Sequence, residues 1–174
     1  MNITEIITKR FISYKELGGK AIQQLDDLQI HWKRDENDNS IFIIVKHLHG
    51  NMLSRFTDFL TSDGEKSWRK RDDEFEEGSA TKQETLKLWT EGWDCLIHTL
   101  HSLNDHDLQK SVTIRGEKLI VVDALIRQIA HYAYHVGQIV CIAKTIKGKD
   151  WQNLSVPKHQ SQEFTREMKE KYKS

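Results

Sequence analysis

Hydrophobic residues recur every three or four positions in four long segments of the chain, which is the spacing of the buried face of an α-helix. The segments span residues 3–29, 40–60, 81–100 and 121–147. The single proline of the chain, Pro157, follows all four segments, so proline interrupts none of these helices. The pattern therefore predicts an all-α fold.

The first two segments carry residues that predict local structure. Gly18 and Gly19 lie inside the first segment, where they either mark a close contact between helices or weaken the helix locally. Asn39 or Ser40 is predicted to cap the second helix, because either side chain can accept a hydrogen bond from a free backbone N–H group at a helix start.

The last two helices also have predictable starts. Thr81 and Glu84 have the spacing of a capping box, which predicts the beginning of the third helix. The sequence SVTIRGEKLIV at 111–121 predicts a short extended piece just before the fourth.

A polar segment, residues 61–83, separates the second and third helices. Its composition does not suit a strand or a buried helix, and its length favours a crossover at the end of a bundle over a tight hairpin. We therefore predict a four-helix bundle with a long crossover between its second and third helices. Trp68, Arg69 and Arg71 stand among acidic neighbours in this segment, and either line a site or an interface or belong to a solvated connection.

The remainder of the chain extends the single domain. Residues 1–150 are assigned to the bundle, and residues 151–174 to a C-terminal segment that docks on it. Trp151, Leu154 and Val156 are the apolar residues available for docking, and the charged end, TREMKEKYKS, is expected to fray.

Charge and composition exclude several classes of protein. Lysine plus arginine number 26, as do aspartate plus glutamate, and this balance argues against nucleic-acid binding, which usually needs a basic excess. No apolar stretch is long enough to span a membrane, and the first residues lack a signal-peptide core, so we expect a cytoplasmic protein. Cys95 and Cys141 are far apart, which predicts neither a disulfide framework nor a thiolate zinc site.

The run HYAYHVGQIV at 131–140 places His131 and His135 four residues apart. Residues at this separation share one helix face, so both imidazoles can reach one metal ion. Tyr132 occupies the position that holds the glutamate base in HEXXH zinc proteases, so that motif is absent. The spacing alone is weak evidence, because nine histidines can form such a pair by chance.

The surroundings of the pair strengthen the hypothesis of a metal site. Arg127, Gln128 and Gln138 share its face, and most of the remaining surface of this helix is apolar. A polar stripe on such a helix should be buried and satisfied inside the protein, and bundle cores build metal sites from stripes of this kind. The alternative is a histidine pair that only forms hydrogen bonds with other helices.

A third ligand is available in KHLHGN, residues 46–51. His47 and His49 lie about 200° apart around a helix, so they cannot both face one ion, and periodicity alone does not choose between them. The other five histidines have polar or loop-like surroundings and are predicted to lie mostly at the surface: His31, His98, His101, His106 and His159.

Three segments, residues 45–76, 125–144 and 151–161, resemble an uncharacterised branch of the DinB-like (DinB/YfiT) superfamily of metalloenzymes. The resemblance rests on the HXXXHXGQI run together with a histidine-leucine pair on the second helix, and it covers nearly the whole chain. It implies a four-helix bundle in which one histidine of the second helix and two of the fourth bind a divalent metal. By this resemblance the ligands are His47, His131 and His135, with His49 as the fallback.

The resemblance also implies a class of chemistry. The superfamily includes transferases and isomerases that use low-molecular-weight thiols such as bacillithiol or mycothiol. Three neutral imidazoles leave a coordination position open, as in catalytic sites, for a water or a substrate thiolate. Zinc is the first expectation, with nickel, iron and manganese as alternatives. Asn51, Arg127 and Gln138 are candidates for orienting the ligands or for holding a carboxylate of a small-molecule substrate.

Two further hypotheses belong to different functional classes. One is a bundle that binds a metal or ligand without catalysis. The other is a structural homodimer whose histidine site is vestigial. A homodimer is expected from the superfamily and from the aromatic residues of the first three helices.

Overall fold

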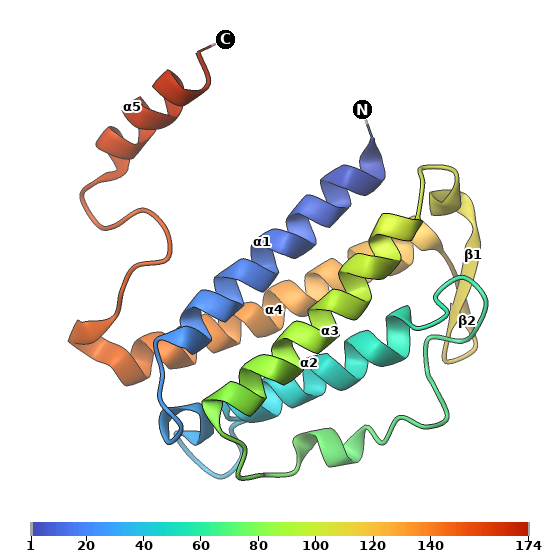
Figure 1. Cartoon of the computed structure of the whole chain (residues 1–174), viewed down its shortest axis with the longest axis horizontal. Coiled ribbons are helices and arrows are strands. Elements are labelled where there is room, and N and C mark those ends of the chain that lie inside the picture. Colours follow the sequence, from blue (N-terminus) through green and yellow to red (C-terminus); the bar gives the residue numbers. More distant parts are fainter. Residues whose placement is uncertain (1, 174) are drawn as a thin grey trace.

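The structure, a computed structural model, describes residues 2–173 (Figure 1). Its helices are α1 (Ile3–Gln23), α2 (Ile41–Phe56), α3 (Lys82–Ser102), α4 (Val121–Lys147) and α5 (Ser161–Lys171), and its strands are β1 (Ser111–Ile114) and β2 (Glu117–Ile120). The prediction of an all-α bundle is confirmed.

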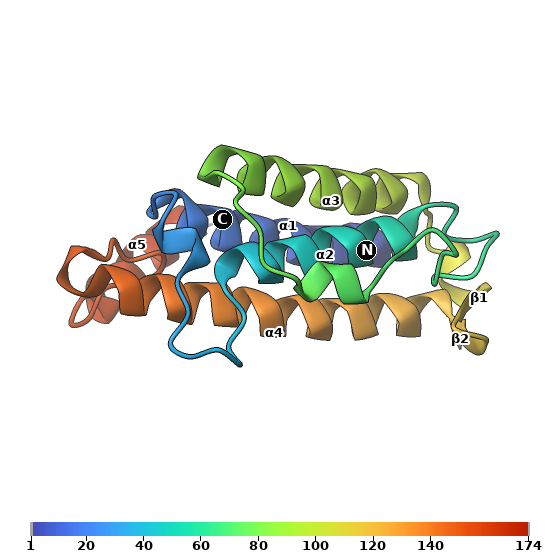
Figure 2. The same cartoon turned by 90° about the horizontal axis from the view of Figure 1, so that it is seen from below.

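Helices α1 to α4 lie side by side, and α1 and α2 each pack against both α3 and α4. In Figure 2, α3 and α4 form the two outer layers, with α1 and α2 between them. The connection from α2 to α3 runs back along the length of the bundle, so these two helices point in the same direction (Figure 1). This is the long crossover that the sequence predicts.

Buried aromatic side chains at the centre of the bundle fix how α4 is rotated about its axis. Tyr132 of α4 is fully buried, with its ring centroid 5.6 Å from that of Trp93 in α3 and 6.0 Å from that of Phe11 in α1. Aromatic pairs of this kind add about 0.5–1.5 kcal/mol to the free energy of burial. Because Tyr132 points into the core, its neighbour His131 is turned toward α2.

The helix ends agree with the sequence in most places. Ser40, rather than Asn39, caps α2, since its hydroxyl accepts the backbone N–H of Ile43 at 3.2 Å. Thr81 and Glu84 form the predicted capping box of α3. The extended piece before α4 is an antiparallel hairpin of β1 and β2.

The first helix is shorter than its periodicity predicts. It ends at Gln23, and Gln29–His31 form a separate 3₁₀ turn. The carboxylate of Asp26 accepts the backbone N–H groups of Leu28 and Gln29, at 3.0 and 2.8 Å. Such side-chain hydrogen bonds offer the backbone an alternative to continuing the helix.

Gly18 marks a close contact between helices, which decides between its two predicted roles. A Cβ atom added to Gly18 would lie 2.5 Å from Cη2 of Trp89, a side chain of α3 that is 4 % exposed. A rigid buried indole cannot move away cheaply, so only glycine allows α1 and α3 to approach this closely.

The Gly18→Ala variant is therefore expected to lower the free energy of unfolding by about 1–3 kcal/mol through overpacking. Gly137→Ala is the matched control, because Gly137 lies in α4 with open space around the position of an added Cβ. We expect this control to raise stability by up to about 1 kcal/mol, since alanine favours helix. Urea denaturation of both variants measures the difference, and equal effects would contradict the close contact.

The C-terminal segment leaves the bundle after α4. Trp151 and Leu154 are half-buried and pack against the hydrophobic core. The charged end that is expected to fray, which begins at Thr165, is helical as far as Lys171. It belongs to α5 (Ser161–Lys171), which stands away from the bundle with no buried residue (Figure 1). Ser174 lies outside the described residues.

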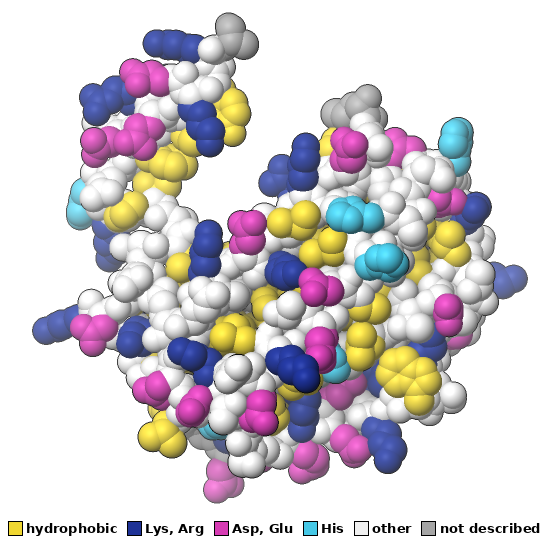
Figure 3. All heavy atoms as spheres, in the orientation of Figure 1, with side chains coloured by type: hydrophobic (Ala, Val, Ile, Leu, Met, Phe, Trp, Pro, Cys, Tyr) yellow, Lys and Arg dark blue, Asp and Glu magenta, His cyan; other side chains and the backbone are white. Residues whose placement is uncertain are grey.

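The surface carries mixed charge. Figure 3 shows lysine and arginine side chains interspersed with aspartate and glutamate over the face seen in Figure 1. Across residues 2–173, none of the helices combines the length and the apolar character that crossing a membrane requires.

Candidate metal centre

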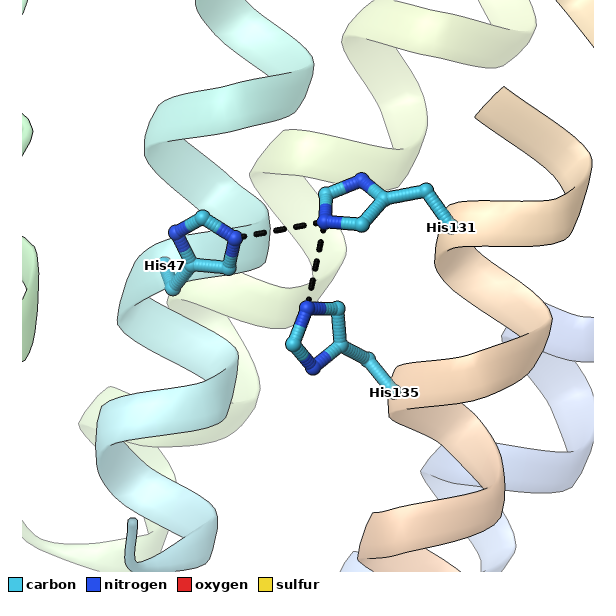
Figure 4. A group of neighbouring side chains, drawn as sticks. All are labelled: His47, His131 and His135. Carbon is cyan, nitrogen blue, oxygen red and sulfur yellow. Dashed lines mark hydrogen bonds between the residues drawn. The ribbon is translucent and has the colours of Figure 1, made fainter. Parts of the chain in front are cut away.

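Three histidines from two helices point toward one another (Figure 4). His47 comes from α2, and His131 and His135 come from successive turns of α4. The Nε2 atom of His131 lies 3.3 Å from that of His47 and 3.1 Å from that of His135. One nitrogen of each of the three rings lies within 4.8 Å of the other two. Nitrogens at 2.0–2.1 Å from a tetrahedral zinc ion stand about 3.3 Å apart, so the two separations from His131 fit a single ion.

The hydrogen bonds on the far side of two rings set their tautomers. His47 Nδ1 lies 2.9 Å from a carboxylate oxygen of Glu74, and His135 Nδ1 lies 2.8 Å from the amide oxygen of Gln138. An oxygen acceptor requires each Nδ1 to carry the proton, so each Nε2 presents a lone pair toward His131. A single proton on His131 Nε2 cannot satisfy both lone pairs well, whereas a cation satisfies all three nitrogens.

The electrostatics keep the pair on α4 neutral. Burial, together with the neighbouring imidazoles, lowers the pKa of His131 to about 3. Burial and the nearby His47 lower the pKa of His135 to about 4. Both side chains are therefore in the neutral form that ligates metals at neutral pH.

Glu74 orients His47 and is itself held by an arginine. It lies in a 3₁₀ turn of the crossover, Asp72–Phe75, and accepts two hydrogen bonds from Arg69, at 2.7 and 2.8 Å. Burial alone would raise the pKa of Glu74, but the hydrogen bonds from His47 and Arg69 hold it below its usual value. The carboxylate thus stays charged and fixes the His47 ring, as carboxylates behind metal-binding histidines commonly do.

The crossover can approach α2 this closely because α2 has a glycine at the contact. A Cβ atom on Gly50 would overlap the carboxylate of Glu74.

The side chain of Arg69 is buried, with 2 % of it exposed, whereas Trp68 is 54 % exposed. Arg71 is half-exposed, with its guanidinium 4.9 Å from the ring centroid of Phe75. Arg69 and Arg71 therefore belong to the site region, and Trp68 lies at the surface.

Sequence reasoning did not find Glu74. It is one of five acidic residues within Asp72–Glu77, and composition cannot tell which of them turns inward. Two features together give a weak signal: Gly50 lies near His47, and a long polar connection returns past α2. A buried histidine needs a hydrogen-bond partner, and a polar loop that covers it can supply one.

Of the three orienting residues predicted from the sequence, Asn51 and Gln138 lie close to the triad. Gln138 accepts from His135, as described above. Asn51 is buried and accepts the hydroxyl of Tyr132 at 2.9 Å, so its amide is held beside the triad. Arg127 is more remote, half-exposed and paired with Glu117 at 2.8 Å.

His49 faces away from the triad. Its Nε2 lies 3.5 Å from a carboxylate oxygen of Glu91 in α3, on another side of α2. Of the two histidines that periodicity could not separate, the structure thus places only His47 with the α4 pair. His31 is half-buried, with Nε2 2.8 Å from the carbonyl of Ala80, and the remaining histidines are exposed: His98, His101, His106 and His159.

The polar stripe of α4 is less buried than the sequence predicts. Ile126 is 57 % exposed and Tyr134 is 61 % exposed, because α4 lies in an outer layer and contacts other helices on one side only. His47 is buried, but His131 and His135 are half-buried. A cavity of about 270 Å³ borders His47 and His131. The triad therefore has a side on which a small molecule can approach.

Comparison with protein families matches residues 2–160 to the family described as "Protein of unknown function (DUF1572)". Comparison with curated proteins found no match.

Proposed function

We propose that this chain, which belongs to the DUF1572 family of proteins of unknown function, is a divalent-metal-dependent enzyme whose ion is held by His47, His131 and His135. The observation that carries the proposal is the convergence of three Nε2 atoms at separations of 3.1 and 3.3 Å, with two of the rings oriented by oxygen acceptors.

Three protein ligands favour a catalytic over a structural site. Structural zinc is usually held by four protein ligands, and three histidines leave a position for a water or substrate. The cavity beside His47 and His131 gives a substrate access to that position. Zinc is the first expectation for imidazole ligands, and nickel, iron or manganese could replace it, since availability as well as affinity decides occupancy.

The similarity to the DinB-like superfamily supports a reaction class, transfer of a low-molecular-weight thiol to an electrophile. A divalent ion bound here would lower the pKa of a thiol or water. In the transfer, the thiol releases its proton to solvent, its sulfur forms a bond to the electrophilic carbon, and the leaving group departs with the bonding electron pair. The residues of the chain hold the imidazoles in place through Glu74 and Gln138 and bury one side of the site under the crossover.

Metal analysis tests the binding part of this proposal. Purified protein supplemented with zinc is expected to retain about one ion per chain, and a variant with His47, His131 and His135 all replaced by alanine is expected to retain none. Less than about 0.2 ion per chain in the wild type would refute the metal site. Wild-type protein that is folded but retains no zinc after supplementation would instead favour the structural homodimer.

Activity is tested separately on metal-loaded protein. The assay combines bacillithiol or glutathione with a panel of generic electrophiles and compares wild type with the triple variant. A metal-dependent rate supports thiol transfer. Metal binding without such a rate would favour a bundle that binds a metal or ligand without catalysis.

A further inference from the structure

The cavity that borders the histidine triad is lined mainly by guanidinium groups. Five arginines contribute to its wall: Arg55, Arg69, Arg71, Arg115 and Arg127. Within residues 2–173, no aspartate or glutamate lines it. This concentration of one charge contrasts with the net charge of zero for the whole chain.

Four separate parts of the chain bring these arginines together. Arg55 is in the last turn of α2, Arg69 and Arg71 lie in the crossover, Arg115 is at the turn of the β1–β2 hairpin, and Arg127 is in α4. The hairpin turn is fixed to the crossover, because the carboxylate of Asp63 accepts the backbone N–H groups of Arg115 and Gly116 at 2.8 and 2.9 Å. The convergence is thus built by the fold and is not a charged run in the sequence.

Three of the five arginines, Arg55, Arg69 and Arg115, outnumber the carboxylates that contact their side chains. Glu65 is shared by all three, with oxygen to nitrogen distances of 3.1 Å to Arg55, 2.9 Å to Arg115 and 3.6 Å to Arg69. Glu74 is the second partner of Arg69, but it also accepts from His47. Three guanidinium groups therefore share two carboxylates, which leaves one excess positive charge among these five side chains.

Arg71 and Arg127 are half-exposed and available to a ligand. Arg71 is 49 % exposed and lies 3.9 Å from the carboxylate of Asp72, and Arg127 is 50 % exposed and pairs with an exposed Glu117. Exposed ion pairs of this kind contribute about 0–1 kcal/mol, so an anion in the cavity can replace these partners at little cost.

Two buried polar atoms in the wall have unused hydrogen-bonding capacity. Nη1 of Arg69 and Oε1 of Gln128 have no hydrogen-bond partner in the described part of the chain, although the side chain of Arg69 is 2 % exposed and Gln128 is 5 % exposed. Leaving such a group unsatisfied costs about 1–3 kcal/mol. An ionised carboxylate or phosphate oxygen accepts hydrogen bonds, so of these two atoms Nη1 of Arg69 is the one that an oxyanion would satisfy.

We propose that this cavity binds the oxyanion group, a carboxylate or a phosphate, of a small-molecule substrate and holds the rest of that molecule against the histidine triad. Guanidinium groups bind such oxyanions through paired hydrogen bonds. A volume of about 270 Å³ suits a small molecule. The catalytic meaning of the site rests on the proposed function, but the anion binding does not require a metal.

The experiment measures anion binding to metal-free protein by isothermal titration calorimetry at constant ionic strength. The probes are inorganic phosphate and succinate, which distinguish a phosphorylated from a carboxylated substrate. We expect saturable binding of at least one probe, and at least about a tenfold loss of affinity in the Arg71→Ala/Arg127→Ala double variant. The matched control, Arg34→Ala/Arg166→Ala, removes the same charge from two exposed positions outside the cavity and should bind within about twofold of wild type.

Two results would overturn the assignment. One is the absence of saturable binding of either probe to metal-free wild type. The other is equal binding by the two double variants, whether both keep or both lose affinity, which would place the anion elsewhere or reduce the effect to net charge. Circular dichroism melts verify that the variants fold. Because the measurement uses metal-free protein, a failed metal site and a failed anion site give different outcomes.

Discussion

The His47→Ala variant is expected to lose at least about a hundredfold in zinc affinity, whereas His49→Ala should bind zinc like the wild type. Both substitutions remove one imidazole from the same helix, two residues apart. The structure places only the first in the triad, with its Nε2 3.3 Å from that of His131, while the second lies against Glu91. A competition titration against a fluorescent zinc chelator measures both affinities. Equal losses in the two variants would contradict the assignment of His47.

The effect of zinc on thermal stability tests the same two variants, His47→Ala and His49→Ala, independently. A ligand that binds only the folded state raises the free energy of unfolding by about 2.7 kcal/mol when its concentration is 100 times the dissociation constant. Zinc should therefore raise the melting temperature of wild type and His49→Ala, and should have little effect on His47→Ala. A shift of similar size in all three proteins would indicate zinc binding outside the triad.

The sequence predicts the helices well because their signals are local. The capping box of Thr81 and Glu84 lies within one turn, and the pattern over 121–147 coincides with α4. Periodicity does not predict the end of α1, because its cause is a pair of competing hydrogen bonds that the backbone N–H groups of Leu28 and Gln29 donate to the carboxylate of Asp26.

The candidate site was predictable only in part, for a similar reason. The spacing of His131 and His135 follows from helix geometry, but the choice of His47 over His49 came from resemblance, since rotation of α2 depends on how it packs. Glu74 and the arginines of the cavity come from a crossover and a hairpin whose positions depend on contacts distant in sequence. Side chains that meet only through such contacts leave no periodic signal.

The Glu74→Leu variant is expected to lose about 3–5 kcal/mol of unfolding free energy, because it leaves Arg69 as a buried charge without its bidentate partner. Replacing both residues, as Glu74→Leu/Arg69→Met, removes both charges and should restore most of this stability. The double variant should still bind zinc about 10–100 times more weakly than wild type, because the Nδ1 of His47 no longer has a carboxylate to orient its ring. Urea denaturation and the chelator competition measure the two quantities separately.

Arg71→Met is the matched control for this pair, since Arg71 belongs to the same crossover but is half-exposed. It should change the unfolding free energy by less than about 0.5 kcal/mol and leave zinc affinity unaltered. If the double variant loses as much unfolding free energy as Glu74→Leu and Arg69→Met lose separately, added together, Glu74 and Arg69 do not act as a coupled pair. If it binds zinc like the wild type, Glu74 does not orient His47. Recovery of stability without recovery of metal affinity would separate the two roles of Glu74, neutralising a buried arginine and fixing a metal ligand.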